Sequence, residues 1–139
     1  MTIDFTAKGQ APGEMTIRRA GAAIGRAPEG ISNAPFWAEM LLESRRDGEN
    51  TAMRATFDPG GRTHWHTHPR GQLLYALSGV GLVQRDGGPI EEVRPGDCVW
   101  FAPGEKHWHG AHAGSVFSYF SIQAVEDGTH VLWLEPVGA

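Results

Sequence analysis

Five of the seven histidines in this chain stand in two tight clusters. The stretch THWHTH carries His64, His66 and His68 at alternate positions, and the stretch HWH carries His107 and His109. Residues two apart in a strand project from the same face with Cα atoms about 6.5 Å apart, so His66 and His68 can converge on one metal ion. His64 and His68 lie about 13 Å apart by the same rise, so one of these three histidines is surplus to a single metal centre.

Two separated histidine pairs on strands are what a β-barrel needs to build a metal site in its interior. The alternative is that HWHTH forms a polar stripe on a solvated sheet face, where each imidazole bonds to a neighbour or to water. We favour the metal site because the second cluster follows a glycine-containing turn, APGEKH, on another expected strand. His112 and His130 stand outside both clusters, and we expect each of them to lie on the surface or in a loop.

The elements that must position these histidines are short strands. Glycine and proline, 19 and 9 residues, are spread along the chain in turns such as APEG, DPGGR and RPGD, a spacing typical of an all-β sandwich or barrel. The segment 36–46 contains helix-favouring Ala, Met, Leu and Glu, but we prefer a strand because it leads into a turn and another strand. The expected strands are 36–46, 51–57, 63–68, 72–78, 80–85, 90–93, 97–102, 107–110, 116–123 and 130–135.

Length and charge narrow the class of protein. A chain of 139 residues most simply makes one domain, and we expect an N-terminal arm over residues 1–30 and a barrel over residues 31–139. The net charge of -4, without a dense run of Lys or Arg, argues against a nucleic-acid surface. No apolar run approaches a membrane span, and the first residues lack the pattern of a signal peptide. We therefore expect a cytoplasmic protein that binds neither nucleic acid nor membrane.

Strand alternation also makes predictions about the surroundings of the site. Trp65 and Trp108 alternate with the histidines, so they should face away from the metal and pack between sheet layers. Tyr75 is expected in the core, and Cys98 is expected there as a small apolar side chain. Because uncovered edge strands invite pairing, we expect a homodimer in which the arm or the strand at 36–46 pairs with a partner.

The spacing of these residues resembles the two motifs of the cupin family. From Gly60 to Gly79 the chain follows the first motif through His66 and His68, with Gln72 where glutamate usually stands. The stretch GDCVWFAPGEKHWHGA follows the second motif as far as His107, with alanine at two positions that usually hold proline and asparagine. The resemblance implies a small single-domain cupin, an all-β, jelly-roll-like double-stranded barrel.

Carried over by position, the cupin pattern implies that His66, His68, Gln72 and His107 are the metal ligands. His109 and His64 then become pocket residues beside the metal. Imidazole and neutral oxygen ligands suit several divalent transition metals, and we expect manganese first, with iron, nickel, cobalt or zinc as alternatives. A neutral glutamine leaves the full charge on the ion and so makes it a stronger Lewis acid than a glutamate would.

Among cupins, THPRGQ, the second motif and the later SIQ are most similar to small bacterial manganese-dependent hydroxynitrile lyases, which cleave or form cyanohydrins. The resemblance implies that Gln123 is a pocket residue, and strand alternation places Tyr119 on the same face. A histidine thought to assist in these lyases falls at Tyr119, and small pocket residues fall at Met53 and Ala55. Tyrosine titrates near a pH of about 10 and is a poor base at neutral pH.

Several classes of reaction are compatible with these residues. His109, His64 or a hydroxide on the metal could act as the base of a lyase. Three histidines and a neutral fourth ligand also support a cupin dioxygenase that acts on a small organic substrate. A third reading is a binding protein whose histidines hold a structural ion. We expect a metal-dependent enzyme with a small-molecule substrate, and we place the lyase first.

Overall fold

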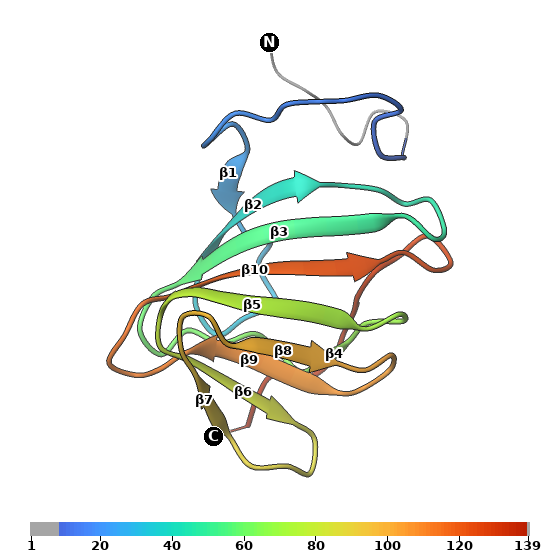
Figure 1. The fold of residues 1–139 in the computed structure, drawn as a ribbon. Helices are drawn as coiled ribbons and strands as arrows, with labels where there is room; N and C mark the ends of the chain where they lie inside the picture. The colour runs from blue at the N-terminus through green and yellow to red at the C-terminus, as the bar shows by residue number, and fades with distance from the viewer. Residues whose placement is uncertain (1–8, 139) are drawn as a thin grey trace.

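The computed structural model describes residues 9–138, in which the chain forms eleven β-strands and no helix (Figure 1). The all-β prediction is therefore confirmed, and the strand preferred for the segment from residue 36 is present. No helix in these residues could span a membrane. The strands are β1 (Ile24–Arg26), β2 (Phe36–Leu42), β3 (Asn50–Phe57), β4 (His66–Thr67), β5 (Gln72–Gly79), β6 (Gly81–Arg85), β7 (Glu91–Val93), β8 (Cys98–Phe101), β9 (His107–Ala111), β10 (Phe117–Ala124) and β11 (Leu132–Trp133).

The strands form two antiparallel sheets. One sheet has six strands in the order β1-β2-β3-β10-β5-β8, and the other has five in the order β11-β4-β9-β6-β7. Strands far apart in the sequence lie side by side, such as β10 between β3 and β5, as a jelly roll requires. The apolar core and the candidate site both lie between the inward faces of the two sheets.

Inward side chains change in character along the central strands of the six-stranded sheet. At one end of the β3–β10 pair, Phe57 lies opposite Phe117, and both are fully buried. At the other end, Thr51 lies opposite Gln123, and these two polar residues are also buried. The sheet thus encloses an apolar core at one end and a polar, buried site at the other.

Two residues expected in the core lie on the outer surface instead. From Gln72 to Leu77 of β5 the side chains alternate, with Gln72 and Leu74 buried and Leu73 and Tyr75 exposed. Cys98 of β8 is the register partner of Tyr75 and is exposed as well. The prediction for Tyr75 was wrong because successive side chains of a strand point to opposite faces. Gln72 points inward, so Tyr75, three residues further on, points outward.

The N-terminal segment contributes a strand to the barrel sheet. β1, which falls within the expected arm, pairs with β2 along its three residues, and residues 1–8 of that arm lie outside the described part. Arg18 reinforces the docking through a salt bridge of 3.0 Å to Glu39. β2 pairs with β3 on one side and, along residues 37–39, with β1 on the other, so β1 of the expected arm forms the outer edge of the six-stranded sheet.

Gly79 is the glycine whose replacement should damage the fold most directly. It has a φ of +75°, and a Cβ built on it would lie 1.7 Å from the backbone oxygen of Val116. We expect Gly79→Ala to lower the free energy of unfolding by about 3 kcal/mol or more, because left-handed strain and a backbone clash add together. Urea unfolding measures this loss.

Gly87→Ala is the matched control for this experiment. Gly87 has a φ of +81°, but a Cβ there meets no atom within 4 Å. Its replacement should cost only about 1 kcal/mol of backbone strain. Equal losses in the two variants would contradict the role of the clash at Gly79.

Candidate metal centre and active site

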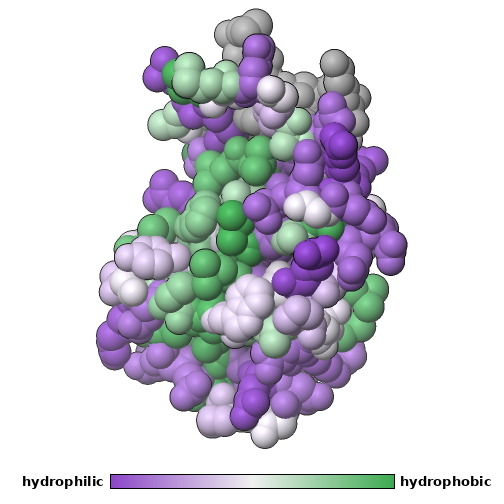
Figure 2. All heavy atoms as spheres, turned by 45° about the vertical axis from the view of Figure 1, so that its right-hand side comes forward, coloured by the Kyte–Doolittle hydropathy of each residue, from purple (hydrophilic) through white to green (hydrophobic). Residues whose placement is uncertain are grey.

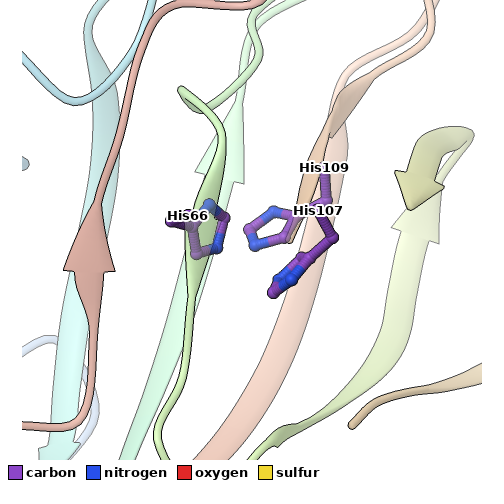
Figure 3. Close-up of side chains that lie close together, drawn as sticks. All are labelled: His66, His107 and His109. Atoms are coloured by element: carbon purple, nitrogen blue, oxygen red, sulfur yellow. The ribbon is translucent and has the colours of Figure 1, made fainter. Parts of the chain in front are cut away.

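Three buried histidines from two neighbouring strands point toward one another in the barrel interior (Figure 3). His66 comes from β4, and His107 and His109 come from β9. The two strands pair at His66 and His107, so the backbone ladder itself brings these rings together. One nitrogen from each of the three histidines lies within 4.8 Å of the others, so the cluster could hold a metal ion.

His68 belongs to the same group of rings. Its ring centroid lies 5.1 Å from that of His66 and 5.4 Å from that of His107. Since the ring of His109 lies 5.1 Å from His66 and 5.9 Å from His107, proximity alone does not decide which three histidines would bind an ion. Phe101 stacks on His107 at 3.6 Å between ring centroids and holds that ring in place.

Hydrogen bonds distinguish the histidines more sharply than distance does. The Nδ1 atoms of His66, His68 and His107 lie 2.9, 2.6 and 2.8 Å from backbone carbonyl oxygens of residues 64, 130 and 105. A carbonyl only accepts, so each Nδ1 carries the proton and each Nε2 keeps its lone pair. Metal-binding histidines are held in this way in proteins. His109 differs, because neither of its nitrogens has a partner in the described part of the chain.

Burial keeps these imidazoles neutral. It lowers the pKa of His68 to about 3, against smaller opposing effects of the residue 130 carbonyl and of the Gln72 side chain. It lowers the pKa of His107 to about 4. The pKa values of His66 and His109 also lie well below the usual range, first because of burial and then because of the neighbouring histidines. Neutral imidazole is the form that binds a metal.

Gln72 begins β5 and presents an amide oxygen in the same interior. Its Nε2 donates to Oε1 of Gln123 at 3.0 Å, and Gln123 Nε2 donates to Oγ1 of Thr51 at 2.7 Å. Gln72 Oε1 is buried and, like Nε2 of His68 and of His107, has no hydrogen-bond partner among residues 9–138. Buried acceptors without partners are rare in proteins, and this set fits a divalent cation.

A cavity of about 430 Å³ opens beside these residues and is of a size that binds small organic molecules. Its polar end includes the predicted pocket residues His109, Tyr119 and Gln123 together with His66, His68 and Gln72. Met53 also lines it, whereas Ala55 is buried in the core. The apolar wall comes from both sheets and from the N-terminal segment and includes Ala23, Ala27, Pro28, Ile31, Phe36, Ala38, Met40, Val131 and Trp133.

His64 is not brought to this cavity. It lines a separate hollow with Asn33, Arg62 and the C-terminal segment, so the expected common face for three alternate histidines was wrong. The reason is that the expected strand is interrupted: Thr63 makes an isolated bridge to Ser32, residues 64–65 are irregular, and only residues 66–67 form a strand. Thr63 and His66, three positions apart, both line the main cavity, which breaks the alternation.

Two residues of the site were missed from the sequence. His130 was expected on the surface, but it lines the cavity, its Nδ1 is buried without a partner in the described chain, and its carbonyl holds His68. Thr51 anchors the two glutamines. Neither stands in a motif, and both reach the site only through packing of distant segments. His112 is half-exposed as expected, and Trp108 is buried away from the cavity with its Nε1 donating to Gln84.

Tyr119 lies at the polar end with a buried phenol. Burial raises the pKa of this hydroxyl above its ordinary value. The phenol is therefore neutral at pH 7 and can donate a hydrogen bond, but it cannot serve as the resting base. Its ring packs edge-on against His109 at 5.0 Å between centroids, which leaves His109 enclosed by aromatic side chains.

Two antiparallel sheets around a buried histidine cluster define a small jelly-roll barrel with a candidate metal centre. The cupin domain family matches residues 53–122. The chain is also 43% identical over 124 residues to an (R)-mandelonitrile lyase from Granulicella tundricola, covering 88% of this chain and 95% of that one. This chain therefore belongs to the cupin family.

Solved structures give the same fold. A cupin-like protein from Thermotoga maritima superposes with a TM-score of 0.75 at 28% identity, covering 90% of this chain and 92% of that one. A polyketide cyclase from Streptomyces resistomycificus superposes with a TM-score of 0.70 at 21% identity, covering 90% and 87%. The second likeness bears on the fold alone.

Proposed function

We propose that this cupin is a metal-dependent hydroxynitrile lyase that cleaves or forms cyanohydrins. The observation that carries the proposal is the set of donors left free in the interior: three imidazoles tethered through Nδ1 and one glutamine oxygen without a partner. The relative named (R)-mandelonitrile lyase supports the reaction and points to an aromatic cyanohydrin as the substrate.

The proposed ligands are His66, His68, Gln72 and His107. We prefer them to a set with His109 because the carbonyl partners direct the Nε2 lone pairs of the three chosen histidines, whereas His109 lacks such a partner. Manganese is the metal we place first. When bound, a divalent ion held by neutral ligands would supply Lewis acidity toward the hydroxyl oxygen of the substrate.

The chain itself must then move one proton. His109 lies on the cavity wall and both of its ring nitrogens lack a partner in the described chain, so one of them can accept the hydroxyl proton of the cyanohydrin. As the carbon–cyanide bond breaks, its electron pair leaves with cyanide and the carbonyl forms. The imidazolium of His109 then returns the proton to cyanide, so that the products are an aldehyde and hydrogen cyanide. Tyr119 and Gln123 can orient the substrate by hydrogen bonds.

Parallel assays of cyanide release and oxygen uptake test the proposal. Manganese-loaded protein given mandelonitrile should release cyanide and benzaldehyde in equal amounts. The rate of release should be well above the rate without protein, and no oxygen should be taken up. Elemental analysis of the purified protein should accompany the assay to identify the bound metal. Oxygen uptake without cyanide release would favour the dioxygenase, and neither activity in metal-loaded protein would favour a binding protein.

We also propose that the chain forms a homodimer, in which strand addition at β1 of the arm and apolar side chains on the outside of β5 and β8 are the candidate contacts. The outward side chains of β5 and β8 include the exposed residues Leu73, Leu77 and Trp100. Figure 2 shows a further band of hydrophobic residues that runs down the middle of the face in view, between hydrophilic residues. Light scattering measures the assembly, and a monomer at all concentrations would remove the idea. A cytoplasmic location stays a prediction that cell fractionation would test.

A further inference from the structure

A line of three buried polar side chains leads from the sheet to the candidate metal centre. Thr51 lies on β3, Gln123 on the neighbouring β10 and Gln72 on the next strand, β5. Their exposed fractions are 2%, 3% and 3%. Because all three are enclosed in the barrel, each hydrogen bond along the line must be made within it.

The direction of this line matters because an amide has two different ends. Its oxygen accepts hydrogen bonds and can bind a cation, whereas its NH2 group only donates. The two ends are nearly the same in shape, so packing alone does not choose between them. If Gln72 turned its NH2 group toward the ion, the fourth ligand would be lost.

Thr51 resolves the choice at the far end of the line. Its Oγ1 lies 3.1 Å from the backbone oxygen of Gln123, which only accepts, so the hydroxyl hydrogen is donated there. The hydroxyl can then only accept from the Gln123 side chain, whose terminal atom lies 2.7 Å away. The same atom lies 3.3 Å from the backbone oxygen of Thr51, another acceptor. Both contacts require this atom to be Nε2.

The orientation of Gln123 then fixes that of Gln72. With its Nε2 toward Thr51, Gln123 turns Oε1 toward Gln72, and the contact of 3.0 Å requires a donor from Gln72. That donor is the NH2 group of Gln72. Its Oε1 therefore points away from the line, where it is buried and has no partner in the described chain.

We propose that Thr51 is a positioning residue whose hydroxyl orients both amides, so that Gln72 presents its oxygen to the metal ion. The inference rests on the proposed function, because it concerns a ligand of that site. Residues that hold a metal ligand in place typically contribute 10- to 100-fold to metal affinity, about as much as we expect of this hydroxyl.

Thr51→Val and Thr51→Ser test the hydroxyl directly. Valine keeps the shape and removes the hydroxyl, whereas serine keeps the hydroxyl. Calorimetric titration with Mn²⁺ should show affinity about 10-fold or more weaker for Thr51→Val and close to wild type for Thr51→Ser. The visible spectrum of the Co²⁺-loaded protein should change for Thr51→Val alone. If Thr51→Val does not fold, Thr51→Ala removes the same hydroxyl without adding bulk.

A second background separates orientation from a general structural effect. In Gln72→Glu both terminal atoms of residue 72 are oxygens, so there is no amide end to choose. Adding Thr51→Val to that background should change Mn²⁺ affinity by about twofold or less. A loss as large as in the wild-type background would overturn the inference, as would wild-type affinity and an unchanged Co²⁺ spectrum in Thr51→Val. A wild-type chain that binds neither metal would overturn the proposed function and the inference together.

Discussion

Replacing His107 by alanine is expected to weaken Mn²⁺ binding by at least about 100-fold and to abolish cyanide release. The ring of His107 is stacked on Phe101 and tethered through Nδ1 to the carbonyl of Glu105, so its Nε2 is fixed in direction. The nearby His109 lacks a carbonyl partner in the described chain that would direct its ring, so we expect it to replace His107 poorly. Calorimetric titration and metal analysis of the purified variant measure the effect.

His112→Ala is the matched control for this variant. It lies one residue past β9, is half-exposed, and contacts Gly114 and the exposed Glu92 rather than the site, so its removal should leave metal affinity and activity unchanged. Full metal occupancy in His107→Ala would contradict the ligand role of His107. Full occupancy in the double variant His66→Ala, His68→Ala would overturn the whole ligand assignment.

The metal-free protein should lose stability steeply as the pH falls from 7.5 to 5. An unfolded histidine titrates near its ordinary pKa of 6.5, whereas the folded pKa values of His68 and His107 are about 3 and about 4. Below pH 6.5 the unfolded chain therefore binds protons that the folded chain excludes, and stability present above that pH is lost. Each of the two should contribute a loss of about 2 kcal/mol over this interval. His66 and His109 act in the same direction.

Urea unfolding of chelator-treated protein at the two pH values measures this dependence. The variant His107→Gln keeps a polar side chain that cannot be protonated, so its loss between pH 7.5 and 5 should be smaller by about 2 kcal/mol. A free energy of unfolding that is the same at both pH values would contradict neutral burial of the cluster. An equal loss in the variant would contradict the part assigned to His107.

The sequence alone predicted the barrel and the group of residues in its interior. Turn spacing and apolar segments indicated strands, and the resemblance to the cupin motifs implied that His66, His68, Gln72 and His107 would lie together, as they do. The strand predictions succeed because turns and the alternation of inward and outward side chains are local properties of the sequence. The ligand roles themselves stay proposals.

Only the tertiary structure decided which further residues join them. The irregular chain before His66 turns His64 into another hollow, and packing of the C-terminal segment brings His130 into the cavity. Thr51 and Gln123 meet across a separation of 72 residues, a pairing that no local pattern encodes. Short-range geometry sets the direction of a side chain, but the pairing of distant strands sets its neighbours. Those neighbours determine which end of Gln72 faces the candidate metal centre.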